Sequence, residues 1–223
     1  MRPGRGLDPG PPTARKGRLS PVPYGEKFED ALVYTTRLHR DQTRKGTDVP
    51  YVTHLLAVAS IVGENGGTED DVVAALLHDT PEDQGGKDRL EEIRTRYGED
   101  VAGIVDGCTD TYEDPKPEWR PRKEAYIAHV SKATPSVRLV SAADKLHNAR
   151  SILADLRALG DELWDRFTGG KDGTLWYYRA LVEAYKGPAS NPVVEELDRV
   201  VREIEALAEG PPSAGQRHAK EQG

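Results

Sequence analysis

The sequence has a single cysteine, Cys108, among 223 residues. One cysteine excludes an intramolecular disulfide framework, and with it the class of small disulfide-stabilised secreted proteins. No apolar run approaches the roughly 20 residues that a helix needs to cross a bilayer, and no apolar signal-peptide segment follows Met1. We therefore expect a cytoplasmic protein that does not cross a membrane. We expect Cys108 to be a small buried thiol and not a nucleophile, because no base is identifiable beside it.

The sequence also has fewer positively charged than negatively charged residues. The chain has 31 Lys and Arg against 38 Asp and Glu, and its net charge is −7. This balance argues against broad binding to nucleic acids or anionic membranes, because both are polyanions. The negative net charge is still compatible with a local basic pocket for a phosphate group. We expect neither a nucleic acid nor a membrane as partner, and the composition leaves the oligomeric state open.

The sequence lacks the period-two alternation of apolar and polar residues that marks a half-buried strand. Between its ends, nearly every patterned segment has helical spacing instead, which predicts an all-α fold. The ends are rich in proline, glycine and charge, so we expect disordered tails over residues 1–22 and 210–223. One domain is then expected over residues 23–209. The longest irregular pieces, residues 43–50 and 109–120, suit the walls of a pocket.

Three local patterns predict where helices begin. Thr68 followed by Asp71 is a capping box, in which each side chain bonds to the backbone of the other residue. Thr134-Pro135 and Asn191-Pro192 each combine an N-cap residue with a proline in the first turn. The helix opened at Thr68 is expected to carry an apolar face and to end in a histidine and an aspartate.

That histidine and aspartate, His78 and Asp79, follow the apolar stretch Ala74-Ala-Leu-Leu77. An imidazole and a carboxylate are costly to bury there unless something pairs them, and a divalent metal ion is the partner that we expect. His54 and Asp144 lie in equally apolar stretches. A lone histidine on an apolar face is usually a satisfied core residue, but four such groups together favour a metal site. Two nitrogen and two oxygen ligands fit Mn²⁺, with Fe²⁺, Zn²⁺ or Co²⁺ not excluded.

These residues stand in a series of short motifs that match a known family in type, order and approximate spacing. The motifs are Arg44-Lys45-Gly46, Pro50-Tyr51-Val-Thr-His54, Leu77-His78-Asp79-Thr-Pro-Glu82-Asp83, Tyr97-Gly98, Val105-Asp-Gly-Cys-Thr109 and Ala143-Asp144-Lys145-Leu146-His147-Asn148-Ala-Arg150. Together they resemble the HD superfamily of metal-dependent phosphohydrolases. More narrowly, they resemble the hydrolase domain of RelA/SpoT homologues, including stand-alone members, which cleave the alarmone (p)ppGpp. The resemblance implies an HD-domain helical bundle.

The resemblance also implies a site. It implies one Mn²⁺ ion bound by His54, His78, Asp79 and Asp144. Glu82 and Asp83, one turn beyond the ligands, would handle the attacking water; the alternative is that they only solvate a helix end. A metal ion and a nearby carboxylate are also what hydrolysis of a phosphate ester requires chemically. Asn148, one turn after Asp144, could reach the metal-bound substrate.

Arg44 and Lys45 precede the His54 helix, where family members contact the nucleotide, and their cationic groups suit base stacking and phosphate contact. Without the motif they would be taken for solvated surface. Weaker candidates for contact with phosphate or ribose are Lys145, Arg122, Lys123 and Tyr177. We expect structural roles for His39, His129 and His147. Gln84-Gly85-Gly86 replaces the residues that commonly follow Glu-Asp in the family, so the pocket rim is expected to differ.

The resemblance implies an enzyme of the stringent response whose partner is a small nucleotide. The expected reaction is that of a guanosine-3′,5′-bis(diphosphate) 3′-pyrophosphohydrolase, which converts ppGpp or pppGpp to GDP or GTP and pyrophosphate. A close alternative is an HD phosphohydrolase for the 2′-phosphate of NADPH or for a deoxynucleotide. A non-catalytic nucleotide-binding module would normally have lost a ligand or the Glu-Asp pair, and this chain retains all six residues.

Overall fold

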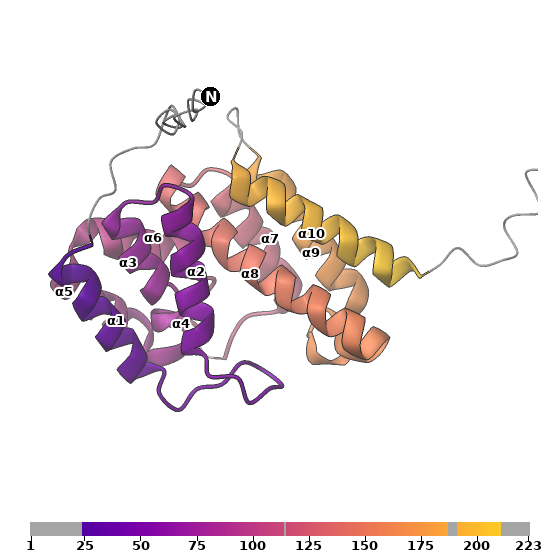
Figure 1. Cartoon of the computed structure of the whole chain (residues 1–223), viewed down its shortest axis with the longest axis horizontal. Helices are drawn as coiled ribbons and strands as arrows, with labels where there is room; N and C mark the ends of the chain where they lie inside the picture. Colours follow the sequence, from indigo (N-terminus) through magenta and orange to yellow (C-terminus); the bar gives the residue numbers. More distant parts are fainter. Residues whose placement is uncertain (1–23, 114, 187–190, 211–223) are drawn as a thin grey trace, which may run out of the picture.

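The computed structural model describes residues 24–113, 115–186 and 191–210 (Figure 1). Over these residues the chain forms helices and connecting loops, and the prediction of an all-α fold is confirmed. The helices are α1 (Glu26–Leu38), α2 (Val52–Glu64), α3 (Glu69–Leu77), α4 (Thr80–Gln84), α5 (Gly86–Tyr97), α6 (Glu99–Cys108), α7 (Trp119–Val130), α8 (Pro135–Leu159), the 3-10 helix η1 (Gly160–Arg166), α9 (Gly170–Tyr185) and α10 (Pro192–Glu209).

Strand structure in the described ranges is limited to one isolated antiparallel bridge between Thr43 and Pro50. This bridge closes the first of the two irregular segments into a loop between α1 and α2. The second irregular segment is shorter than expected, because α7 begins at Trp119 and not after Arg120. None of the described helices is long and apolar enough to span a membrane.

The predicted helix starts are confirmed at all three places. Thr68 accepts a hydrogen bond from the backbone N–H of Asp71 at 3.2 Å, and Asp71 accepts one from the backbone N–H of Thr68 at 2.8 Å. Thr134 accepts from the backbone N–H of Val137 at the start of α8. The Asn191 side chain caps α10 in the same way. The predicted N-terminal tail, residues 1–22, and all but the first residue of the predicted C-terminal tail, residues 210–223, lie outside the described residues. The domain limits therefore stay a prediction.

Helix α8 is the central element of the fold. Helices α2, α3 and α6 pack against it on the side of the N-terminal helices, and α10, α9, α7 and η1 pack against it from the C-terminal part of the chain (Figure 1). Five successive residues of α8, 140–144, are buried, so the helix is enclosed on all sides at this level. A polar side chain there must find a partner, since an unpaired charge in such surroundings is strongly unfavourable.

Candidate active site

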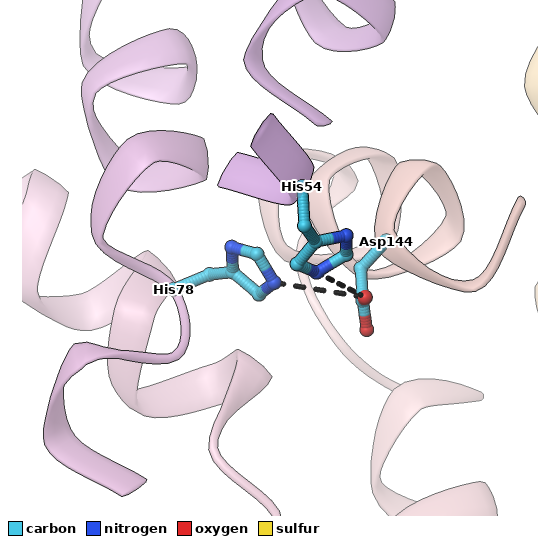
Figure 2. Close-up of side chains that lie close together, drawn as sticks. All are labelled: His54, His78 and Asp144. Atoms are coloured by element: carbon cyan, nitrogen blue, oxygen red, sulfur yellow. Dashed lines mark ion pairs between the residues drawn. The ribbon is translucent and has the colours of Figure 1, made fainter. Parts of the chain in front are cut away.

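Three helical segments bring His54, His78 and Asp144 together in the core (Figure 2). His54 comes from the first turn of α2, His78 from the end of α3, and Asp144 from the buried stretch of α8. The Oδ1 atom of Asp144 lies 3.2 Å from Nε2 of His54 and 3.6 Å from Nε2 of His78. One potential ligand atom from each residue lies within 4.8 Å of the other two.

Asp79, at the junction of α3 and α4, completes the group. Its Oδ2 atom lies 3.4 Å from Nε2 of His54 and 3.1 Å from Nε2 of His78. The structure therefore brings together all four residues that the sequence marks as metal ligands. We call this group, His54, His78, Asp79 and Asp144, the ligand cluster.

The ligand cluster fits a divalent metal ion. The Nε2 atoms of His54 and His78 are buried and have no hydrogen-bond partner among the described residues. Burial opposes the ionisation of Asp144, but the charge of Lys145 and the two histidines that face the carboxylate hold its pKa well below the usual range. Two unpaired imidazole nitrogens facing two ionised carboxylates are a donor set for a borderline or hard divalent cation.

A hydrogen-bond partner from outside the ligand cluster orients each of three of its members. Such partners fix the direction of a ligand's lone pair and commonly matter nearly as much as the ligand itself. The pairs are the Tyr51 hydroxyl donating to Asp79 Oδ2 at 2.5 Å, the Asn148 amide donating to Asp144 Oδ1 at 2.5 Å, and His147 Nδ1 beside His54 Nδ1 at 2.8 Å.

His147 is a functional candidate that the sequence interpretation missed, because it was expected to be structural. Burial, followed by the nearby charges of His54 and Arg44, lowers the pKa of His147 to about 4. The His147 ring is therefore neutral at pH 7 and able to hydrogen-bond to Nδ1 of His54. The sequence feature that could have identified His147 is its position three residues after Asp144, one turn along the same helix.

A cavity of about 590 Å³ opens beside the ligand cluster. Its wall includes Tyr51, His147 and Asn148, the three residues that orient the ligands, and also Arg44, Lys45 and Tyr178. Arg44 donates a hydrogen bond to Asn148 Oδ1 at 2.8 Å, while Asn148 donates to Asp144. A continuous chain of hydrogen bonds thus runs from the loop between α1 and α2 to the ligand cluster.

Glu82 and Asp83 lie on α4, within one turn of Asp79. Lys116 donates to Glu82 Oε1 at 2.5 Å, and Gln42 donates to Asp83 Oδ2 at 2.7 Å. Burial and the negative charge of Asp79 raise the pKa of Asp83 above the usual range for a carboxyl group. A carboxylate with a raised pKa near a metal site has the character of a general base.

The weaker substrate candidates gather in a second charged group that does not line the cavity: Lys145, Arg122, Lys123 and Tyr177. Lys145 pairs with Asp144 at 2.6 Å, and Lys123 pairs with Asp110 at 2.7 Å. Burial and the charges of Lys145 and Arg122 lower the pKa of Lys123 to about 7. Asp110, which also pairs with Arg122, was not identified from the sequence.

The remaining histidines have the structural contacts expected of them. His39 is buried and bonds to Gln42, and His129 bonds to the carbonyl of Gly107. Cys108 is half-buried, where a buried thiol was expected. Burial nevertheless raises the pKa of its thiol, which argues against a nucleophilic role.

Known proteins are similar to this chain in fold and in sequence. An HD-domain family model matches residues 31–174. The guanosine-3′,5′-bis(diphosphate) 3′-pyrophosphohydrolase MESH1 of Xenopus tropicalis is 38% identical over 176 residues, which cover 77% of this chain and 90% of the relative. MESH1 of Drosophila melanogaster is 35% identical over 180 residues, 79% of this chain and 94% of the relative. The solved structure of a metazoan ortholog of SpoT that hydrolyzes ppGpp superposes with a TM-score of 0.69 at 28% identity, covering 83% of this chain and 99% of that one.

Proposed function

The chain belongs to the HD-domain family, and we propose that it hydrolyses the 3′-diphosphate of ppGpp and pppGpp, releasing pyrophosphate and leaving GDP or GTP. The observation that carries this proposal is the hydrogen-bonded chain from Arg44 through Asn148 to Asp144, which joins a nucleotide-sized cavity to the ligand cluster. The activity of the MESH1 relatives supports the same substrate class. We further propose that the enzyme works in the cytoplasm in the stringent response, on a small nucleotide and on neither a nucleic acid nor a membrane.

The residues that would hold the metal ion are His54, His78, Asp79 and Asp144, and we propose Mn²⁺ as the ion. When bound, a divalent ion polarises a phosphate oxygen and activates water. The unpaired Nε2 atoms support this assignment, because nothing else in the described chain satisfies them. Lys145 offsets part of the negative charge of Asp144 and holds one of its oxygens in place.

Glu82 and Asp83 are proposed to position the attacking water and to accept its proton. Both lie within one turn of the ligand Asp79, and the raised pKa of Asp83 suits a group that must take up a proton near neutral pH. Asn148 is proposed to bind the substrate phosphate while it orients Asp144. The proton taken up by the carboxylate would balance the proton that the ribose 3′ oxygen gains when its bond to phosphorus breaks and it leaves as a hydroxyl group.

Arg44 and Lys45 are proposed to contact the nucleotide, since both line the cavity on the side of the loop between α1 and α2. The four residues of the second charged group are proposed to contact phosphate or ribose: Lys145, Arg122, Lys123 and Tyr177. The first three supply the cationic groups. The ion pairs of Lys145 with Asp144 and of Lys123 with Asp110 fix the positions of these charged side chains relative to one another.

The direct test is a product analysis with purified, Mn²⁺-loaded protein. We expect ppGpp to yield GDP and pyrophosphate, separated by anion-exchange chromatography, and not orthophosphate. NADPH and a deoxynucleoside triphosphate serve as the competing substrates. Orthophosphate from NADPH, or product from the deoxynucleotide, with no pyrophosphate from ppGpp would overturn the alarmone assignment and leave a metal-dependent phosphohydrolase of other specificity.

A further inference from the structure

An ion pair lies in the cavity wall beyond the residues that orient the ligands. Asp155, near the C-terminal end of α8, accepts a hydrogen bond from Arg166 of η1 at 3.0 Å, and both residues line the cavity. An ionised carboxylate accepts about four hydrogen bonds. One bond from Arg166 therefore leaves Asp155 with capacity for a ligand.

One face of α8 connects this pair to the ligand cluster. Asp144, Asn148, Ser151 and Asp155 follow one another at spacings of four, three and four residues, which places them on one face of a helix. Asn148, Ser151 and Asp155 all line the cavity, and Asn148 bonds to Asp144. Asp144 and Asp155 are separated by roughly 16 Å along the helix axis at 1.5 Å per residue. That separation leaves space for a ribose between a phosphate at the cluster and a base at Asp155.

The cavity wall around Asp155 suits a flat aromatic ring. Ile152 of α8, Leu163 and Phe167 around η1, and Tyr178 of α9 contribute apolar or aromatic surface to it. A ring held against such surface is fixed by a few polar groups at its edge, and these groups determine which ring binds. Asp155 and Arg166 are charged groups of the wall at this end of α8.

We propose that Asp155 determines base specificity by accepting hydrogen bonds from N1–H and the 2-amino group of guanine. This inference rests on the proposed function and names the group that selects the base. Adenine presents a lone pair at N1 and a C–H at position 2, so its edge offers a carboxylate no donor there. A site that hydrogen-bonds one ligand discriminates strongly against an analogue that lacks the donor. Asp155 would thus favour guanine nucleotides over NADPH, which carries adenine.

Arg166 acts in this arrangement as a positioning residue for Asp155. Its side chain also packs on Gly46, where an added Cβ would lie 3.4 Å from the Arg166 side chain. Gly46 has a φ of 75°, which favours glycine, and it follows Arg44 and Lys45 directly. Arg166 thereby holds the nucleotide-facing loop and the specificity carboxylate in one arrangement.

Binding of GDP, IDP and ADP to the Mn²⁺-loaded protein tests the inference. In isothermal titration calorimetry the affinity of the wild type should decrease from GDP to IDP to ADP, because IDP lacks the 2-amino group and ADP lacks both donors. Asp155→Asn should reduce the GDP-over-ADP preference about tenfold or more, the range expected for a hydrogen bond to a charged group. Asp165→Asn is the matched control, since Asp165 precedes Arg166 and does not line the cavity.

Arg166→Gln separates base recognition from a role in folding. It should reduce the GDP-over-ADP affinity ratio less than Asp155→Asn does, because it removes the group that positions the carboxylate and not the carboxylate itself. An Asp155→Asn variant that keeps the wild-type preference, or that weakens GDP and ADP equally, overturns the inference. Pyrophosphate release from ppGpp is measured separately in the wild type. Loss of base preference in Asp155→Asn without pyrophosphate release from ppGpp would support base recognition and overturn the proposed reaction. Pyrophosphate release with an unchanged base preference in Asp155→Asn would support the proposed reaction and overturn base recognition by Asp155.

Discussion

Each histidine of the ligand cluster has its Nδ1 atom engaged, so Nε2 is the atom that it can offer to a metal ion. His78 Nδ1 lies 2.8 Å from the carbonyl oxygen of Ala75, which accepts the ring N–H, so Nε2 is the nitrogen that faces the carboxylates. His54 Nδ1 faces His147 in the same manner, although the partner is a side chain. The backbone partner of His78 cannot be removed by substitution, but the partner of His54 can.

Replacing His147 therefore tests whether an orienting partner matters for metal binding. His147→Phe removes the nitrogen that faces His54, and we expect the affinity for Mn²⁺ to fall about 10-fold to 100-fold, the usual effect of losing such a partner. Calorimetric titration of the metal-free protein measures it. His129→Phe is the control, because His129 bonds to the Gly107 carbonyl and not to the cluster. Equal Mn²⁺ affinity in both variants would show that His147 does not act through His54.

The carboxylates on α4 are expected to act on water and not on the metal ion. Glu82→Gln with Asp83→Asn should leave bound Mn²⁺ nearly unchanged and lower kcat on ppGpp by about 10² to 10⁴, the typical contribution of general acid-base groups. Metal content by atomic absorption and turnover are measured on the same sample. Asp88→Asn on α5 removes a nearby exposed charge and serves as the control. Loss of the metal in a folded variant would make these residues ligands instead.

Arg44 is expected to contribute more to binding the base of the nucleotide than to binding its phosphate groups. Its guanidinium lies 6.0 Å from the centroid of the Tyr51 ring and bonds to Asn148. A planar cation over a base contributes about 1 kcal/mol or more when desolvated, so Arg44→Ala should raise KM for ppGpp several-fold. Hydrolysis of p-nitrophenyl phosphate, which has no base to stack, should change less, and Arg40→Ala should change neither. Equal losses on both substrates would assign Arg44 to phosphate binding or folding.

At the scale of the helices, sequence patterns predicted what depends on neighbours within one turn. The caps at Thr68, Thr134 and Asn191 are made by residues two or three positions apart, so the pattern alone specifies them. Helix α7 was not predicted, because Tyr126 and Val130 are its only buried residues and leave no clear apolar period. Tyr178 and not Tyr177 lines the cavity, a difference set by the rotation of α9 against its neighbours, which no local pattern encodes.

The capping box of α3 offers a test at this scale. Thr68→Ala removes the hydroxyl that accepts from Asp71, and we expect the free energy of unfolding to fall by about 1 kcal/mol, the common effect of losing an N-cap. Urea denaturation measures it. KM for ppGpp should not change, because the cap lies at the opposite end of α3 from His78. Thr95→Ala, at an exposed position of α5, is the control. A KM change in Thr68→Ala alone would show that the cap also positions the ligand cluster.

For the molecule as a whole, the ligand cluster lies where the N-terminal helices meet α8. His54 belongs to α2, His78 and Asp79 to the junction of α3 and α4, and Asp144 to α8. These segments are distant in sequence and adjacent in the fold, so the motifs identified the ligands while only the packing around α8 explains their meeting. An ion bound here would link three parts of the core.

Bound metal should therefore stabilise the whole fold. A ligand that binds only the folded state adds RT ln(1 + [L]/Kd), about 2.7 kcal/mol when the free ion is at 100 times its Kd. We expect Tm to rise with Mn²⁺ concentration and to fall on addition of EDTA, measured by differential scanning calorimetry. Asp144→Asn should abolish the dependence, because it removes the carboxylate that faces both histidines. Asp155→Asn, on the same helix but outside the cluster, should keep it. A wild-type Tm that does not change with Mn²⁺ concentration, or an equal dependence in Asp144→Asn, would mean that the cluster is held by its own ion pairs and not by a metal ion.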